Sequence, residues 1–137
     1  MDAAQVLADL TEISSQIQSA VLFDEGGNLA ASTLGDEARG GEFARRAKEL
    51  LAAAEGVRPG GGEPLTQLEV ATHEGSVFVV RDGSRYVAAT TSPEPTVGLV
   101  FYDLKSCLRS LEQPEPAEPE KPKRTRKKAE DEEQSGA

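Results

Sequence analysis

Few residues of this 137-residue sequence could perform chemistry on their own. The chain contains one histidine, His73, and one cysteine, Cys107. A histidine titrates near neutral pH and is therefore the usual candidate for a general acid or base. His73 stands beside a Glu74-Gly75 turn, and no motif places a nucleophilic serine near it. We therefore expect an exposed turn residue; the alternative is a role for His73 in a site.

Cys107 lies on an apolar helical stripe, between Leu104 and Leu111. A reactive thiol needs a lowered pKa, and nothing around Cys107 indicates one. We therefore predict a buried, inert thiol. With one cysteine and one histidine, the chain can form neither an internal disulfide nor a Cys/His zinc cluster. The single cysteine suits a reducing compartment, and we expect a cytoplasmic location.

Two further motifs lack what their chemistry requires. Gly60-Gly61-Gly62 is followed by Glu63-Pro64, whereas a phosphate-binding loop needs Lys-Ser or Lys-Thr after its glycines. The adjacent acids Asp24-Glu25 and Asp36-Glu37 fall in predicted turns without further ligands, so we expect solvated acids there. The sequence therefore predicts no metal, no nucleotide or other cofactor, and no enzyme activity from this chain alone.

Charge and hydropathy divide the chain into two parts. Lys and Arg number 15 and Asp and Glu number 24, for a net charge of -9. Residues 113–137 contain no Leu, Ile, Val, Met or aromatic residue, so burial cannot offset their ordering entropy. We predict one domain over residues 1–112 and a disordered charged tail over 113–137. The acidic domain should repel nucleic acid, and no apolar run is long enough for a membrane span.

The tail contains one strongly basic run. Six of the eight residues from Lys121 to Lys128 are Lys or Arg, and Glu130-Asp131-Glu132-Glu133 follows them. Such a run can bind nucleic acid, an anionic membrane or an acidic partner, although the neighbouring acids weaken each of these. The sequence allows two interpretations: a solvated tail, or a segment that docks on a partner.

Hydrophobic periodicity predicts the elements that position these residues. Asp2 should cap the first helix, with Gln5 completing a capping box. Gly40-Gly41 is expected to break the chain before the second helix. The predicted helices cover residues 3–18, 42–55 and 96–111, and the predicted strands cover residues 19–23, 29–33, 65–72, 76–80 and 85–91.

The order α-β-β-α-β-β-β-α predicts an α/β (α+β) fold with a five-stranded, largely antiparallel sheet. Residues 77–80 are uniformly apolar, which indicates a central strand covered on both faces. We therefore expect the first and third helices on one face of the sheet and the second helix on the other. The alternating strand over 65–72 contains neither Pro nor Lys, and we expect an unprotected sheet edge there.

Three stretches resemble the roadblock/dynein light chain family, whose fold is profilin-like. Residues 17–32 (IQSAVLFDEGGNLAAS) resemble the first hairpin of that family, and residues 74–80 (EGSVFVV) resemble its fourth strand. Residues 96–104 (TVGLVFYDL) resemble the opening of its last helix. The resemblance covers residues 1–111 and agrees with the predicted element order, so it implies a bacterial-type roadblock domain.

The resemblance also implies a function. Domains of this family form homodimers or heterodimers, in which the second helix packs on its mate and the third strands pair into one sheet. Bacterial members often regulate or scaffold a small Ras-like GTPase. We therefore expect a non-catalytic, homodimeric interaction protein with a GTPase as its partner chain. The alternatives are a profilin-like sensor of a small ligand and a structural adaptor that acts through the charged tail.

The second helix and third strand supply the candidate site residues. The outward face of this helix is either solvated or a partner-binding surface, and its alanines would let another helix approach closely. Which flank forms the dimer contact stays open. The core stripe of the helix is predicted as Phe43, Ala47, Leu50, Leu51 and Ala54. The predicted dimer interface comprises Ala44, Lys48, Leu51, Ala52, Leu65, Gln67 and Glu69, and the predicted partner-binding residues are Arg45, Arg46, Lys48, Glu49 and Ala53.

Overall fold

The computed structural model of the chain describes residues 2–58, 60 and 62–112. The predicted tail, with the run from Lys121 to Lys128, lies outside the described residues. Within this described part, no helix combines the length and apolar character needed to cross a lipid bilayer. The elements are α1 (Ala3–Ile13), β1 (Ile17–Asp24), β2 (Leu29–Ser32), α2 (Glu37–Val57), β3 (Gln67–Thr72), β4 (Gly75–Asp82), β5 (Arg85–Thr91) and α3 (Val97–Glu112).

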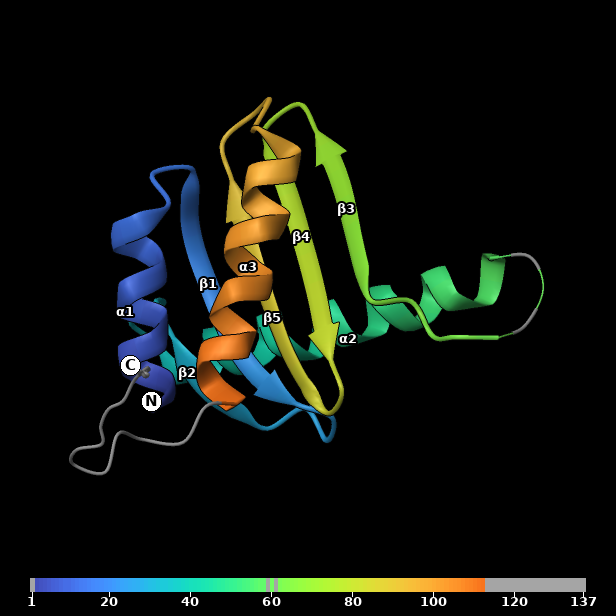
Figure 1. Cartoon of the computed structure of the whole chain (residues 1–137), viewed down its shortest axis with the longest axis horizontal. Coiled ribbons are helices and arrows are strands. Elements are labelled where there is room, and N and C mark those ends of the chain that lie inside the picture. Colours follow the sequence, from blue (N-terminus) through green and yellow to red (C-terminus); the bar gives the residue numbers. More distant parts are fainter. Residues whose placement is uncertain (1, 59, 61, 113–137) are drawn as a thin grey trace, which may run out of the picture.

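The strands form one antiparallel sheet in the order β2-β1-β5-β4-β3 (Figure 1). The predicted fold class and element order are thereby confirmed. β4 lies inside the sheet and β3 lies at one edge, as their residue patterns predict. The other edge is the short strand β2.

The helices cover the sheet on both faces, as predicted (Figure 1). α1 and α3 pack on one face, over a core that includes Leu22 and Phe78. α2 packs on the other face, over a second core that includes Val21 and Val79. Phe78 and Val79 are adjacent in β4 and both are fully buried, which explains why this strand shows no alternation.

The prediction for the first helix is wrong at its C-terminal end. α1 ends at Ile13, although Ile17 continues its helical spacing. Ile17 is instead the first residue of β1 and is 8% exposed, whereas Ile13 is 73% exposed. The helix therefore ends before Ile17, because burial of this side chain in the sheet stabilises the strand more than the helical spacing stabilises a longer helix.

The N-terminal cap of α1 is only partly as predicted. The Asp2 carboxylate accepts a hydrogen bond from the Gln5 backbone N–H at 2.9 Å, so Asp2 is the cap. The Gln5 side chain donates to Asp9 Oδ1 instead of completing a capping box.

The prediction for the second helix is wrong at its N-terminal end. α2 begins at Glu37 and runs without a break through Gly40-Gly41. Asp36 is its N-cap, because the Asp36 carboxylate accepts a hydrogen bond from the Ala38 N–H at 2.9 Å. Asp36 and Glu37 therefore stabilise a helix terminus and are not merely turn acids.

Gly40 is a packing residue of α2. A Cβ atom at this position would lie 2.8 Å from Ser32 Oγ and 3.0 Å from Leu29 Cδ2. The absent side chain lets the N-terminal part of α2 approach β2 closely.

Candidate functional site

α2 and β3 together form the candidate site. α2 crosses behind the sheet, and its C-terminal end extends past β3 (Figure 1). Among the described residues, β3 pairs with β4 alone. Alternate backbone N–H and C=O groups along its outer side therefore have no strand partner, and such an edge can accept a strand from another chain.

The sheet beside this edge is incompletely covered by α2. Leu68 and Val70 of β3 stand opposite Val79 and Val77 of β4, and opposite residues point to the same face of a sheet. Val79 is fully buried, whereas Leu68, Val70 and Val77 are only half-buried. A half-buried apolar set so close to an open edge indicates a surface that a second chain can cover.

One flank of α2 continues this apolar surface. Phe43 and Leu50 pack against the core on the α2 side, yet both remain half-buried. We call this surface the open apolar face: Phe43, Leu50, Leu68, Val70 and Val77.

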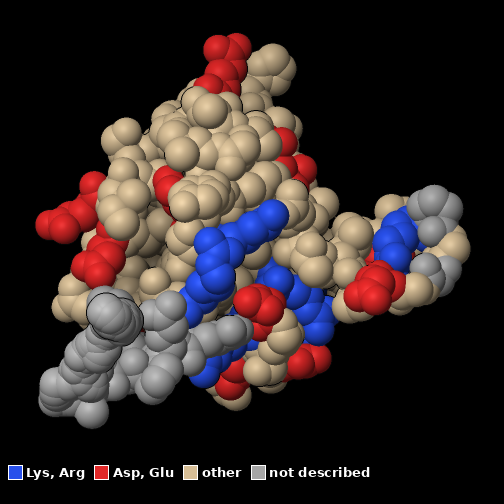
Figure 2. All heavy atoms as spheres, in the orientation of Figure 1, with Lys and Arg blue, Asp and Glu red and all other residues tan. Residues whose placement is uncertain are grey.

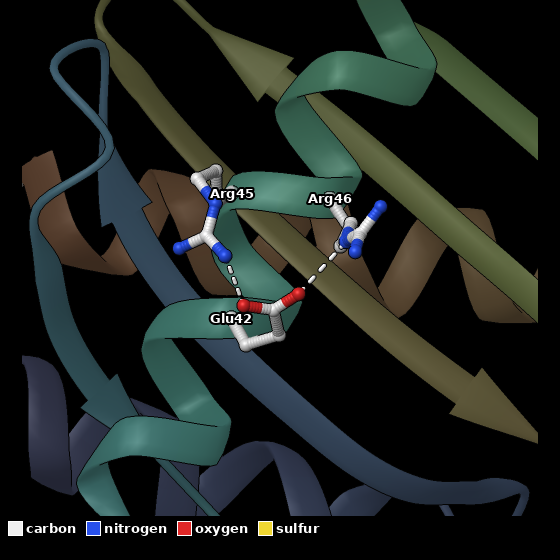
Figure 3. Close-up of polar contacts among 3 residues, drawn as sticks. All are labelled: Glu42, Arg45 and Arg46. Atoms are coloured by element: carbon white, nitrogen blue, oxygen red, sulfur yellow. Dashed lines mark hydrogen bonds and ion pairs between the residues drawn. The ribbon is translucent and has the colours of Figure 1, made fainter.

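Charged residues occupy the side of α2 that points away from the sheet. The Glu42 carboxylate accepts hydrogen bonds from Arg45 and from Arg46, the latter with an Nε–Oε2 distance of 2.8 Å (Figure 3). The hydrogen bond from Arg46 is the main cause that lowers the pKa of Glu42, and the same bond raises the pKa of Arg46. All three side chains are exposed, so these pairs add little stability. They do keep two guanidinium groups together on an accessible surface.

Lys48 lies between this charged surface and the core. Its Nζ is 6.0 Å from the centroid of the Tyr86 ring, and Arg81 Cζ is 5.3 Å from the same centroid. Tyr86 also stacks on Phe23, with ring centroids 5.1 Å apart, and burial raises the pKa of Tyr86. The half-buried Lys48 therefore contacts its own protomer and offers only part of its side chain to a partner.

The structure corrects two of the predicted interface residues. Ala44 is 0% exposed and Leu51 is 3% exposed, and both pack under α2 against the sheet. Neither residue is accessible to a second chain. The prediction assigns Phe43 and Leu50 to the core and Ala44 to the outer surface. In the structure, the small residues Gly40, Ala44 and Ala47 lie on the sheet, and they turn Phe43 and Leu50 toward the flank of the helix.

The other predicted site residues remain accessible. Gln67 and Glu69 lie on the face of β3 that looks toward α3, because they stand opposite Val80 and Phe78. Glu69 accepts a hydrogen bond from Ser76 Oγ at 3.1 Å. Arg45, Arg46, Glu49, Ala52 and Ala53 are exposed, whereas Lys48, Leu65, Gln67 and Glu69 are half-buried.

The sequence-based prediction includes no residue of the open apolar face in the interface. Two signals for it are present in the sequence. Leu68 and Val70 are two residues apart, so their apolar side chains lie on the same face of the predicted edge strand. In addition, α2 carries apolar residues on two flanks, which is wider than the stripe a single contact with a sheet requires.

The remaining candidates have local roles. His73 is exposed in the turn between β3 and β4, and Cys107 is 6% exposed in α3, as predicted. Burial raises the pKa of the Cys107 thiol to about 12. Asp24 is an exposed acid that closes the β1–β2 turn, where hydrogen bonds from Asn28 lower its pKa. The described residues contain no group of three or more His, Cys, Asp or Glu side chains suited to a metal ion.

Comparison with solved structures identifies the fold. A Roadblock/LC7 domain from Streptomyces avermitilis matches with a TM-score of 0.72 and 20% sequence identity, over 81% of this chain and 95% of that chain. The fold is that of a roadblock domain. Myxococcus xanthus MglB matches with a TM-score of 0.61 and 15% identity, over 80% of this chain and 87% of that chain.

The roadblock fold also resembles profilin, as predicted. Acanthamoeba castellanii profilin II matches with a TM-score of 0.53 and 14% identity, over 79% of this chain and 94% of that chain. No family model matches the sequence, and no curated protein matches it either.

Proposed function

We propose that this roadblock-fold chain is a non-catalytic, dimeric interaction protein that regulates or scaffolds a small Ras-like GTPase. One observation carries the dimer part of the proposal: the unpaired edge strand β3 itself contributes Leu68 and Val70 to the open apolar face. In a monomer both would face water. In a complex, the edge supplies main-chain hydrogen bonds and the apolar residues supply buried area.

A second copy of the chain is the occupant that we propose for this surface. Antiparallel pairing of two β3 strands gives a two-fold axis at the edge and brings the open apolar faces of both copies together. The end of α2 that extends past β3 would then reach the partner (Figure 1). Other proteins of this fold assemble: MglB, matched here with a TM-score of 0.60 and 15% identity, occurs in a tetrameric arrangement.

The GTPase partner rests on the resemblance to the roadblock family, and α2 offers the surface for it. Arg45, Arg46 and Glu49 are exposed, and Figure 3 shows Arg45 and Arg46 on the outer side of the helix, away from the sheet. A dimer presents two copies of this charged surface. Charges of this kind speed association with an oppositely charged partner and help to select it.

Affinity capture from native cells tests the GTPase part of the proposal. The wild-type chain serves as bait beside an Arg45→Glu/Lys48→Glu variant of α2. A Lys105→Glu/Arg109→Glu variant of α3 is the matched control, because it makes the same charge change on the opposite side of the sheet. Each capture is run with GDP and with a non-hydrolysable GTP analogue, and mass spectrometry identifies the bound proteins.

We expect a GTP-binding protein whose recovery depends on the nucleotide, falls with the α2 variant and persists with the α3 control. Loss of a central contact typically costs about 2 kcal/mol, or roughly thirtyfold in affinity. Recovery of no GTP-binding protein by the wild-type chain would contradict the proposed partner. Equal recovery by all three baits would remove α2 as its binding surface.

A further inference from the structure

A second accessible groove lies between α1 and α3, on the sheet face opposite to α2. Its cavity has a volume of about 270 Å³. Val6, Leu10 and Cys107 line its floor and are almost fully buried. Ile13 and Tyr102 border it and are 73% and 63% exposed. Apolar surface is therefore open on a side of the molecule that the proposed dimer does not use.

The groove is also acidic. Asp9 of α1 and Asp103 of α3 both line it, and Asp103 is only 8% exposed. Asp9 accepts a hydrogen bond from Gln5 Nε2, whereas no hydrogen bond or ion pair joins the Asp103 carboxylate to any other described residue. The Asp103 carboxylate is thus unpaired within the described part of the chain, and a cation that enters the groove can pair with it.

Lys105 and Arg109 of α3 are not lining residues of this groove, although Arg109 donates a hydrogen bond to Ser106 Oγ, which does line it. α1 contains no Lys or Arg, and Lys105 and Arg109 of α3 border a different cavity, next to β4. Figure 2 shows this separation, with acidic side chains over α1 and basic side chains over α3. The groove therefore suits a ligand that combines positive charge with apolar or aliphatic groups.

We propose that the groove binds the basic run of the same chain, Lys121 to Lys128. The run begins nine residues after Glu112, where α3 ends. An extended chain of that length spans about 30 Å, whereas the 16 residues of α3 span about 24 Å. The run can therefore reach every part of the groove without leaving its own protomer.

The chemistry of the run matches the groove. Lys and Arg head groups pair with Asp9 and Asp103, while their aliphatic stems cover Ile13. A guanidinium group can also stack on the exposed ring of Tyr102. Because the run is tethered, its effective concentration at the groove is on the order of millimolar, so even a weak contact is populated. Salt weakens this contact, because charge pairing contributes to it.

Paramagnetic NMR on the full-length chain tests this docking. A Cys107→Ala/Ala129→Cys chain carries one nitroxide label directly after the basic run. Broadening of backbone amide signals then reports which helices the run approaches. An Asp9→Asn/Asp103→Asn variant removes the two carboxylates, and a Glu37→Gln/Glu49→Gln variant on α2 is the matched control. A further variant replaces the six basic residues of the run by Gln and, apart from the Cys107→Ala change shared by all labelled chains, leaves every described residue unchanged.

At about 50 mM salt we expect broadening of amides near Asp9, Ile13 and Tyr102, and loss of most of it at about 500 mM salt. The broadening should disappear in the Asp9→Asn/Asp103→Asn variant and in the Gln-substituted run, and persist in the α2 control. Groove amides that stay sharp at low salt would overturn the proposal. So would broadening that appears only when labelled and ¹⁵N-enriched chains are mixed, because the run would then belong to another copy.

Discussion

At the scale of single residues, adjacent positions with the same amino acid have opposite roles. Gly40 faces β2, where a Cβ atom would lie 2.8 Å from Ser32 Oγ. Gly41 has no atom within 4 Å of such a Cβ. From the sequence alone, Gly40 and Gly41 are equally expected to break a helix. Only the packing of α2 against β2 shows that Gly40 is needed for close contact and Gly41 is not.

Substitution of each glycine by alanine tests this difference. Gly41→Ala should raise the free energy of unfolding by about 0.5–1 kcal/mol, because alanine favours a helix interior over glycine. Gly40→Ala gains the same propensity but forces α2 away from β2, and we expect a net loss of about 1–2 kcal/mol. Urea denaturation of the three chains measures both changes. Equal stabilisation by the two substitutions would contradict the close contact at Gly40.

The buried thiol of Cys107 gives a second residue-scale prediction. Its pKa in the folded chain is about 12, against an ordinary value of 9.0. As pH rises above about 9, the unfolded thiol therefore loses its proton while the folded thiol keeps it. The free energy of unfolding should consequently fall between about pH 9 and pH 12.

Two measurements check this prediction. A disulfide reagent such as DTNB should label Cys107 at pH 8 only after denaturation. The wild-type chain should also lose stability more steeply above pH 9 than a Cys107→Ala variant does. Rapid labelling of the folded chain would show that the thiol is accessible, contrary to its 6% exposure.

At the scale of elements, the sequence predicts the places of β3 and β4 in the sheet, but not the ends of the helices. The alternation of β3 and its lack of Pro and Lys correctly predict an edge strand, and the apolar run of β4 correctly predicts an interior strand. The two wrong helix ends have a common cause, because long-range burial overrides local pattern at Ile17 and at Gly40. The burial of Ala44, predicted at the interface, depends on the rotation of α2 on the sheet. Periodicity alone does not fix that rotation when both flanks of a helix are apolar. Leu51 is buried as its place in the predicted core stripe requires, so its assignment to the interface is wrong for a different reason.

The same strand allows a paired test of the proposed dimer. Val70 belongs to the open apolar face, whereas the next residue, Ala71, points to the opposite face of β3 and is exposed. Val70→Glu should weaken the dimer by roughly thirtyfold or more, because it places a charge in a buried apolar contact. Ala71→Glu adds the same charge one residue away and should have a much smaller effect.

Sedimentation velocity over a range of protein concentrations measures both variants. Circular dichroism should confirm that each variant keeps the fold, since the two side chains are not in the fully buried core. A dimer that tolerates Val70→Glu as well as Ala71→Glu would exclude the open apolar face from its interface.

At the scale of the whole molecule, the two faces of the sheet have separate tasks in this account. The face with α2 and β3 offers an apolar surface and an unpaired edge, which we assign to the dimer. The face with α1 and α3 offers an acidic groove, which we assign to the basic run. The predicted division into a domain and a charged tail stays a prediction, because residues 113–137 lie outside the described part of the chain.

Hydrogen exchange at the backbone amides of β3 tests the central claim of a dimer paired through this edge. The measurement follows each amide from Gln67 to Thr72 by NMR at protein concentrations below and above the dimer dissociation constant. Amides that bond to β4 should be protected at every concentration. Amides that point outward should exchange quickly in the monomer and slow down as the dimer forms, because they gain hydrogen bonds to the partner strand. Outward amides that exchange equally fast in the monomer and in the dimer would contradict pairing through β3.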